Sequence, residues 1–393
     1  MPLTPGVYIQ EVSSGSKPIE SVGTSTAAFL GVPTKEGAVL HTPTLVTSWS
    51  QFSEKFGGLP KELPNKPEEM DNPYVPEKLL PYAVYQFFAE GGSKCYIVGI
   101  SDASEATQAE PKKGLKALDP IEDVNMIATP DAKGEKSLMM EGISYCAKRK
   151  NCVFIADSNP ELLDAQSVQQ EYAEAFSTSS YGALYYPWIH SLITPQEVKN
   201  KIKVMLPPSG AIAGIYARAD STVGVHKAPA GLKSNVRTAR GLAYTMTHGE
   251  QENLNANGIN AIRSFPGKGI VVWGARTLAT TTDAEWKYIN VRRLFIYVEE
   301  SLKRGMQWAV FEPNSPRVWG SIKRNIRAFL WRVWQDGALF GKTEDEAFFI
   351  KVDKENNPQP RRDAGELIVD IAIAPVKPAE FVIIRISQKV LES

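Results

Sequence analysis

The fold of this chain is decided by three short apolar segments: NMIAT at 125–129, CVFIA at 152–156 and GALYYPW at 182–188. Two segments of helical character, 135–150 and 167–176, lie between them. Strands that alternate with helices pair in parallel, and the helices then cover the faces of the sheet. We therefore predict an α/β fold class with a mostly parallel sheet.

A first α/β block precedes these segments. Its predicted elements are strands at 27–32, 44–47 and 95–100 and helices at 48–56 and 79–89. Ser48 or Ser50 is a suitable N-cap for the first helix, and Gly91 and Gly92 end the second. Between Pro60 and Pro76 the chain is rich in proline and charge, which indicates a surface loop.

The region that follows, Pro207 to Gly274, is rich in Gly, Ala and Pro, and we expect it to be packed but irregular. Apolar residues then recur at helical spacing from Tyr288 to Leu302, with Gly305 ending or bending that helix. A second helix is predicted over 315–335. Strands are predicted to follow at 347–352, 366–374 and 380–387, so the C-terminal part is α+β, a helix-plus-sheet arrangement.

The helix at 315–335 is amphipathic in an unusual way. One arc is apolar, and no acidic residue occurs between Pro313 and Gln335. Its other arc carries four basic residues, Arg317, Lys323, Arg324 and Arg327, with Arg332 at the margin. Such an arc is either a solvated helix face or a contact for an acidic partner.

Both ends of the chain have the composition of β-strands on loose tethers. Residues 6–12 (GVYIQEV) precede a polar tether at 13–18, and residues 381–386 (FVIIRI) follow Pro375 and Pro378. An extended segment needs a sheet edge to pair its main-chain groups, so each end is a natural donor in β-strand addition. From the residues alone, the favoured interpretation is that each strand closes a sheet within its own subunit, because sequential elements usually lie next to each other.

Composition limits the partners. The chain has 393 residues, 43% of them hydrophobic, which suggests two or three domains. Its 44 basic and 44 acidic residues cancel, so no overall electrostatic field favours binding to nucleic acid or to an anionic membrane.

The three cysteines, Cys95, Cys146 and Cys152, lack the spacing of metal ligands and are interpreted as buried thiols of a protein made in a reducing compartment. We expect neither a signal peptide nor a transmembrane segment, and synthesis in the cytoplasm.

Two catalytic motifs are imitated but incomplete. Gly337–Thr343 (GALFGKT) has three residues where a phosphate-binding P-loop needs four before its Gly-Lys-Thr, and it follows a helix instead of a strand. A helix end at Gly337 and a turn at Gly341 explain both glycines. Ser25, in GTSTA at 23–27, resembles a protease nucleophile but sits at the end of a tether without rigid support.

Histidines and carboxylates give no stronger signal. The four histidines, His41, His190, His226 and His248, lie far apart, so we expect no metal site. His226 and His248 are most simply polar loop residues, and Glu299 and Glu300 most simply solvate a helix. We therefore expect no catalytic residue, no cofactor and no enzyme activity.

Several segments together resemble the contractile sheath proteins of phage tails and of bacterial contractile injection systems. Each is weak alone, but their order spans almost the whole chain. They are PGVYIQE at 5–11, PPSGAIAGIYAR at 207–218, KAPA at 227–230, GIVVWGART at 269–277, NVRRL at 290–294, FEPN at 311–314 and PVKPAEF at 375–381.

The resemblance implies an outer α/β region described in that family as subtilisin-like in fold, an inner C-terminal region and terminal arms. The implied divisions are an N-terminal arm at 1–24, an α/β region at 25–100, an outer α/β domain at 101–283, an inner sheath domain at 284–377 and a C-terminal arm at 378–393. The arms would insert into sheets of neighbouring subunits, which reverses the preference for self-contained pairing. The arm residues are Val7, Tyr8, Ile9, Gln10, Glu11, Val12, Phe381, Val382, Ile383, Ile384, Arg385 and Ile386.

The resemblance further implies a structural subunit that polymerises helically around an inner tube and contracts to drive the tube through a target envelope. Its partners would be copies of itself, the inner tube protein, and baseplate and terminator or cap proteins, without nucleic acid or direct membrane insertion. The basic arc could then contact the tube. The product would be cytoplasmic at first and then part of a phage tail or phage tail-like particle. Two other classes stay open: a non-contractile, tube-like filament protein and an α/β nucleotide-binding enzyme.

Overall fold

Two units make up the chain, and they are described separately. A computed structural model describes residues 18–59, 74–107, 110–173, 179–193, 202–279, 283–381 and 383. The large unit comprises residues 24–293 and 376–393, and the small unit residues 1–23 and 294–375. Most of the predicted arm strands, 7–12 and 382–386, therefore lie outside the described residues.

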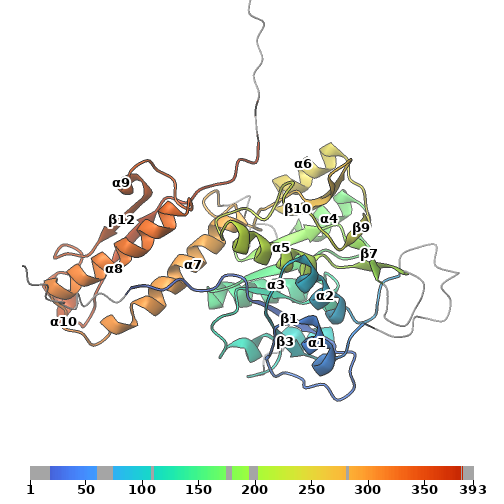
Figure 1. Ribbon diagram of the computed structural model, residues 1–393, viewed down its shortest axis with the longest axis horizontal. Coiled ribbons are helices and arrows are strands. Elements are labelled where there is room, and N and C mark those ends of the chain that lie inside the picture. The colour runs from blue at the N-terminus through green and yellow to red at the C-terminus, as the bar shows by residue number, and fades with distance from the viewer. Residues whose placement is uncertain are drawn as a thin grey trace, which may run out of the picture. The chain divides into compact units, whose positions relative to one another are not determined.

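An eight-stranded sheet forms the centre of the large unit, in the order β11-β10-β6-β5-β4-β1-β3-β2 (Figure 1). The six inner strands run parallel, and β2 and β11 are antiparallel edges. Their bounds are β1 Ala27–Gly31, β2 Thr44–Val46, β3 Cys95–Gly99, β4 Met126–Ala128, β5 Val153–Asp157, β6 Gly182–Tyr186, β10 Ile259–Phe265 and β11 Gly269–Val272.

Helices and a second, antiparallel sheet complete the large unit. The helices are α1 Trp49–Phe56, α2 Leu80–Glu90, α3 Lys136–Arg149, α4 Ala165–Glu171, α5 Ser209–Thr222 and α6 His248–Ala256, with 3₁₀ turns η2 Ala103–Thr107, η3 Gly114–Leu118 and η4 Pro130–Ala132. The second sheet has the order β8-β7-β9, formed by β7 Ile189–Ile193, β8 Ile202–Leu206 and β9 Ala239–Leu242.

Both faces of the parallel sheet are buried, as helices on each side require. In β6, Leu184 and Tyr186 join the cluster that α3, α4 and α6 cover. Tyr185, between them in sequence, points to the opposite face, where its hydroxyl lies 2.5 Å from that of Tyr216 in α5. Alternate residues of one strand thus pack against different helices.

The predicted strands at 125–129, 152–156 and 182–188 are confirmed with small shifts in their ends, as β4, β5 and β6. The first block belongs to the same sheet, because β1 lies between β3 and β4. Of the two proposed N-caps for α1, the structure selects Ser48, whose hydroxyl accepts a hydrogen bond from the Gln51 N–H.

The prediction of irregular structure over Pro207–Gly274 was wrong, because this region contains α5, β9, α6, β10 and β11. Its small residues allow close packing instead of disrupting helices. A Cβ at Gly210 would lie 2.4 Å from the Ala83 carbonyl oxygen, and one at Gly214 would lie 2.6 Å from that of Phe87. Helix α5 therefore approaches α2 more closely than larger side chains would allow. His248, predicted in a loop, is the first residue of α6.

The small unit combines two long helices with a two-stranded sheet. Helix α7 (Ile289–Gly305) belongs to it from Leu294 onward and is followed by the turn η6 (Gln307–Ala309). The remaining elements are α8 Pro316–Gln335, α9 Glu344–Ala347, β12 Phe348–Lys351, α10 Gln359–Asp363 and β13 Asp370–Ile373. The apolar arc of α8 is buried as predicted, through Ile322, Ile326, Phe329, Leu330 and Val333.

Two further predictions concern the C-terminal part. The helix end at Gly337 is confirmed, since this residue directly follows the C-cap of α8 with φ of +80°. The strand predicted over 380–387 is not formed at its first two residues, Glu380 and Phe381. They take up other contacts, described below, and most of that segment lies outside the described residues.

Candidate functional site

The first candidate joint is the base of the N-terminal arm, where Ile19 is fixed to the small unit. Its side chain is buried, 1% exposed, and packs on Gly305 at the end of α7, where a Cβ would lie 2.7 Å from it. Arg332 of α8 donates a 2.7 Å hydrogen bond from Nη2 to the Ile19 carbonyl oxygen. The glycine that ends α7 thus makes room for the side chain that anchors the arm.

Hydrogen bonds to α7 continue this attachment. The Val22 N–H donates to the Ser301 hydroxyl at 3.2 Å, and the Tyr297 hydroxyl lies 2.8 Å from that of Ser21. Burial of one isoleucine side chain contributes about 1.5 to 3 kcal/mol, to which these hydrogen bonds add. The segment that leads to the arm is therefore held along its length.

A buried ion pair fixes the chain where it enters the large unit. Arg293 binds Asp220 through Nη2 at 2.6 Å, and their side chains are 3% and 5% exposed. The same carboxylate accepts a 2.7 Å hydrogen bond from the Thr24 hydroxyl, and Arg293 donates to the Thr24 carbonyl at 3.0 Å. The guanidinium also lies over the Tyr216 ring, 4.6 Å from its centre. A charge so enclosed is tolerated because every side of it is paired.

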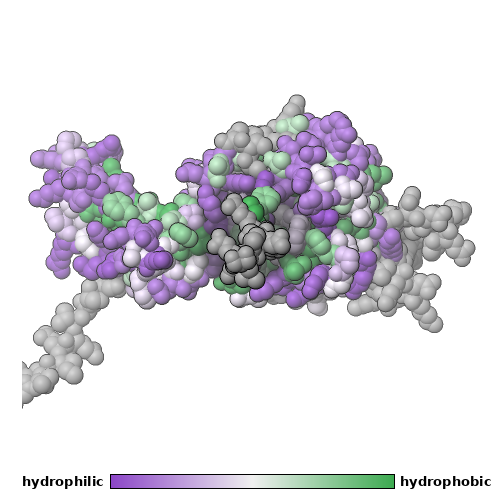
Figure 2. Space-filling view, turned by 90° about the horizontal axis from the view of Figure 1, so that it is seen from above, coloured by the Kyte–Doolittle hydropathy of each residue, from purple (hydrophilic) through white to green (hydrophobic). Residues whose placement is uncertain are grey.

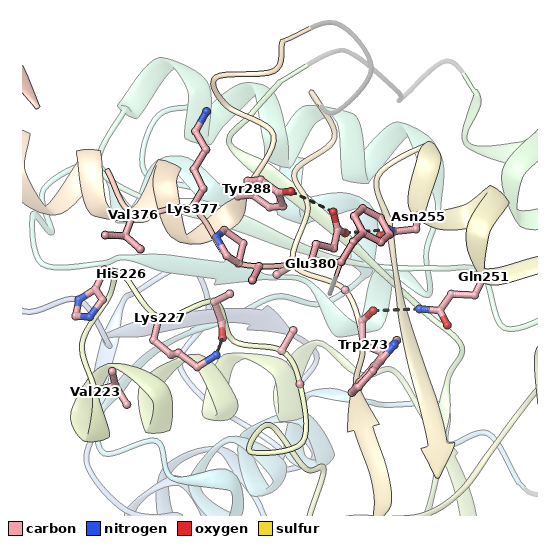
Figure 3. A pocket seen from close by; sticks show the side chains of 18 of the residues that line it. Val223, His226, Lys227, Gln251, Asn255, Trp273, Tyr288, Val376, Lys377 and Glu380 are labelled. Atoms are coloured by element: carbon pink, nitrogen blue, oxygen red, sulfur yellow. Dashed lines mark hydrogen bonds between the residues drawn. The ribbon is translucent and has the colours of Figure 1, made fainter. Parts of the chain in front are cut away.

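Glu380 lies at the base of the predicted C-terminal arm, and Figure 3 shows its carboxylate with hydrogen bonds to Tyr288 and Asn255. Arg276 donates to both carboxylate oxygens, from Nε at 2.8 Å and from Nη2 at 2.6 Å. Asn255 donates from Nδ2 at 2.9 Å and the Tyr288 hydroxyl at 3.1 Å. Four hydrogen bonds thus converge on one carboxylate from three parts of the large unit.

Electrostatics keeps this carboxylate charged. Burial raises the pKa of Glu380, but hydrogen bonds from Arg276 and Asn255 lower it by more, so the net shift is downward. The neighbouring Lys287 amine lies 3.8 Å from the carboxylate, and its own pKa is lowered, chiefly by burial and then by Arg276. The Glu380 carboxylate is therefore ionised near neutral pH, and its hydrogen bonds with Arg276 and Asn255 are then strongest.

The C-terminal segment also lines a pocket of about 700 Å³ in the large unit (Figure 3). Val376 to Phe381 form one side, and Trp273 and Lys227 belong to the rest of the lining. The side chains of His226 and His248 lie at this pocket too, although they come from different elements. No group of three metal-ligating side chains occurs here or elsewhere in the described ranges.

In the small unit, β12 and β13 form a sheet of two strands, and within the described residues neither pairs with a further strand. Strands β12 and β13 pair antiparallel, with Phe348 opposite Ile373 and Lys351 opposite Asp370. In such a pair alternate residues direct their main-chain groups away from the partner strand. On its outer face, Phe349 is 55% exposed. An incoming strand could pair at such an edge and cover this side chain.

The predicted tube-contact residues all lie on the exposed face of α8, at Arg317, Lys323, Arg324 and Arg327. Arg327 makes a two-point contact with Glu344, at 2.5 and 2.8 Å, and Arg324 donates to the Ser321 hydroxyl at 3.0 Å. Of the predicted arm residues, Phe381 and Ile383 are described, and their side chains are 70% and 80% exposed.

Hydrophilic residues predominate on the face shown in Figure 2, and hydrophobic residues form smaller patches. Within the described ranges, no helix combines the length and apolar character needed to cross a membrane. Large exposed aromatic side chains therefore differ from the hydrophilic residues that predominate on this face.

Three of the anchoring residues come from the segments that carried the family resemblance. Arg276 is in GIVVWGART, Arg293 in NVRRL and Glu380 in PVKPAEF. No sequence pattern indicates that they meet charged or polar partners, because Asp220 and Asn255 lie in unremarkable stretches. A buried ion pair is a property of the folded chain.

Two family models match the chain. Residues 104–278 match the phage tail sheath protein central domain, and residues 281–389 match the phage tail sheath C-terminal domain. Among curated proteins, the tail sheath protein of Vibrio phage KVP40 is 29% identical over 178 residues, and that of Salmonella phage ViI is 27% identical over 172. These alignments cover 45% and 43% of this chain and 26% of each relative, so the chain spans about a quarter of their length.

Solved structures match over nearly the whole chain. The sheath complex of an extracellular contractile injection system, PVC, in its contracted state is 30% identical with a TM-score of 0.75, covering 99% of both chains. The helical sheath of the anti-feeding prophage, also contracted, is 29% identical with a TM-score of 0.74, covering 99% of this chain and 100% of the other. A sheath tail protein from Listeria innocua, 10% identical with a TM-score of 0.61 over 92% and 94% of the two chains, shares the fold.

These matches define a structural class, the tail sheath proteins. The chain belongs to the phage tail sheath protein family. Its likeness to the PVC and anti-feeding prophage sheaths extends across both units.

Proposed function

We propose that this protein is the structural subunit of a contractile sheath, which assembles helically around an inner tube and contracts to drive that tube through a target envelope. The observation that carries the proposal is the match, over 99% of the chain, to sheaths solved in a contracted state. Its partners are further copies of itself, the tube protein, the baseplate and terminal cap proteins. It works without catalytic residues, first in the producing cell and then in the particle.

The arms join the subunits. Residues 1–24 and 378–393 pair with sheets of neighbouring copies, and the outer edges of β12 and β13, which pair with no further strand among the described residues, are suitable acceptors. Ile19 and Glu380 support this role, because each fixes the base of an arm to the body of its own subunit. Force applied to an arm is then transmitted to a folded unit.

Contraction uses energy stored in subunit packing. The extended sheath is metastable, and subunits rotate into a wider and shorter lattice when the baseplate triggers them. A main-chain ladder between subunits survives rotation while the tether residues 13–18 absorb it. In this arrangement residues 284–377 form the inner wall and residues 101–283 lie further out.

Basic residues of α8 contact the tube. Arg317, Lys323 and Arg324 present their charges to solvent, where weak and screened contacts can form and later release. Arg327 is a weaker candidate than the other three, since Glu344 already binds its guanidinium at two points.

Removal of the N-terminal arm tests the proposal. A chain without residues 1–16 keeps Ile19 and should fold with the melting temperature of the full chain, yet form no striated cylinders in electron micrographs. Cylinders of normal length and yield from this truncation would contradict strand exchange. A chain without residues 61–70, which belong to neither predicted arm, is the matched control and should assemble.

Electron microscopy also separates the alternative functions. A contractile sheath gives hollow cylinders in two states that differ in length and width. A non-contractile filament gives one length per subunit, and an enzyme gives a small oligomer with saturable ligand binding. Observation of a single filament state under every triggering condition would favour the non-contractile class.

A second test addresses the tube contact. The double variant Arg317→Glu and Lys323→Glu leaves the Arg327–Glu344 contact intact and should reduce the yield of sheath on tubes. Arg361→Glu is an exposed control in the same unit, outside α8. Equal yields from the double variant and the wild type would refute the role of the basic arc.

A further inference from the structure

The loop between α7 and α8 carries an aromatic side chain that the fold of the subunit does not use. Phe311 is 102% exposed, and its neighbour Val310 is 64% exposed. Among the exposed large hydrophobic residues of the described ranges, Phe311 has the highest exposed fraction, and contiguous exposed apolar side chains are candidate interaction sites.

The backbone of Phe311 is strained as well. Its φ is +66°, the left-handed region, which bulky side chains rarely adopt. A glycine or asparagine would satisfy the same turn at lower energy. Strain of this kind persists where the surrounding structure imposes it, and it is concentrated at functional sites.

The loop is held rigidly on both sides of Phe311. Main-chain hydrogen bonds join Val310 to Gln307 at 3.2 Å and Glu312 to Ala309 at 3.2 Å. Beyond it, Asn314 donates to the Glu366 carbonyl and accepts from the indole N–H of the buried Trp319, each at 2.8 Å. The backbone that carries Phe311 is therefore held on both sides, which lowers the backbone entropy lost on binding.

The position of the loop indicates the partner. It begins directly after Gly305, the residue on which Ile19 packs, so it lies beside the base of the N-terminal arm. Under the proposed function, the copy that receives this arm is the partner expected nearest to the start of the loop. The inner tube is a poorer fit, because Met306 to Asn314 carry a single charge, the acidic Glu312, unlike the basic arc of α8.

We propose that the Val310–Phe311 pair is a contact between subunits, with the Phe311 ring inserted into an apolar recess of a second copy of this chain. The inference rests on the proposed function, since it requires a sheath lattice. An apolar side chain on a held backbone gives two neighbouring subunits a specific contact. The arm, by contrast, connects the subunits flexibly.

The test replaces Phe311 with Asn, which tolerates the left-handed backbone, and with Gly, which removes its strain. Both variants should keep or raise the melting temperature of the unassembled subunit. Loss of the buried ring should raise the concentration needed for assembly roughly 10- to 100-fold. Phe311→Leu should restore part of the assembly. Leu163→Asn removes another exposed apolar side chain, 58% exposed, from the large unit and should assemble normally.

Four outcomes would overturn the inference while leaving the wild type assembled. Phe311→Asn could polymerise at the wild-type concentration, or it could lower the melting temperature of the subunit, which would make the ring structural. It could also assemble alone yet fail only with the inner tube, making the tube the partner. If Leu163→Asn impaired assembly to the same degree, assembly would depend on exposed apolar residues in general and not on a specific contact of Phe311. Failure of the wild type itself to form sheaths would instead refute the proposed function.

Discussion

Arg276 and Glu380 are 104 residues apart in sequence, and their side chains meet through two hydrogen bonds of 2.8 and 2.6 Å. Arg276 is 7% exposed in its side chain and Glu380 is 18% exposed. This pair attaches the C-terminal segment to the large unit, so the stability of that attachment depends on one carboxylate.

Replacement of this carboxylate should loosen the segment. Glu380→Gln leaves the Arg276 charge buried without its partner, which typically costs roughly 2 to 5 kcal/mol. We expect a lower melting temperature and faster proteolysis between Val376 and Phe381, measured by mass spectrometry of the fragments. Because the pKa of Glu380 is lowered in the fold, its contribution is present above its unfolded pKa and is lost as pH falls.

Glu252→Gln is the matched control for this change. Glu252 lines the same pocket but is 69% exposed and pairs with the exposed His248. Exposed ion pairs contribute little to stability, so this variant should have the melting temperature of the wild type. Equal effects of the two substitutions would mean that the Arg276–Glu380 pair is no stronger than a surface contact.

Asp157 should make the subunit less stable at alkaline pH. Burial raises the pKa of this carboxyl to about 7, even though it accepts a 2.7 Å hydrogen bond from the Ser209 N–H. The folded chain keeps a proton that the unfolded chain releases near its ordinary pKa, so this stability is lost as pH rises through about 7.

Asp157→Asn retains an acceptor for Ser209 without the charge. Its gain in unfolding free energy over the wild type should be larger at pH 8, on the order of 2 to 4 kcal/mol, than at pH 5. Thermal or urea unfolding at both pH values measures it. Asp164→Asn should show no gain at pH 8, because hydrogen bonds from Ser167 lower the pKa of that partly exposed cap. A pH-independent difference for Asp157→Asn would be evidence against a buried neutral carboxyl.

Even an added methyl group at Gly214 in α5 should destabilise the subunit. The added Cβ would lie 2.6 Å from the Phe87 carbonyl oxygen and from Glu90 Cβ, so α2 and α5 must separate. We expect Gly214→Ala to lower the unfolding free energy by roughly 1 to 3 kcal/mol, despite the higher helix propensity of alanine. Denaturant unfolding of the unassembled subunit checks this value.

Gly249 in α6 provides the control, since a Cβ there meets nothing within 4 Å. Gly249→Ala should cause no loss and a gain of up to about 1 kcal/mol. If both alanine variants were equally stable, close packing of α5 on α2 would not be the reason for Gly214.

The base of the N-terminal arm should depend on Ile19. Ile19→Ala removes most of a buried side chain, a change that costs about 2 to 5 kcal/mol in a packed core, and this loss falls on a short terminal segment. We expect local release, seen as faster proteolysis of residues 18–23, with little change in the melting temperature. Glu20→Ala, at the exposed neighbouring position, should leave the proteolysis rate unchanged. Equal rates for both variants would mean that Ile19 does not anchor the segment.

Hydrophobic pattern determined much of the fold in advance. The segments at 125–129, 152–156 and 182–188 predicted parallel strands, because a run of apolar residues bounded by turns satisfies a sheet that is buried on both faces. The amphipathic helix α8 was equally predictable, because its apolar residues recur at helical spacing and its basic residues fall on the opposite face. Both signals are local and periodic.

The Gly- and Ala-rich region was misread for a physical reason. Glycine has a low helix propensity, so Gly210 and Gly214 argued against a helix. The approach of α2, which only glycine permits, outweighs that propensity. A contact between helices more than 100 residues apart leaves no periodic signal in either segment.

The sequence by itself determined the strand-like composition of both arms, the parallel α/β character and the order of the motifs that identify a sheath protein. Only the tertiary structure decided which residues hold the described segments at the bases of the two predicted arms. Ile19 on Gly305, Asp220 with Arg293 and Arg276 with Glu380 all join distant parts of the chain. Hydrophobic periodicity is a local property of the chain, whereas the partner of a buried charge is chosen by the fold that removes both from water.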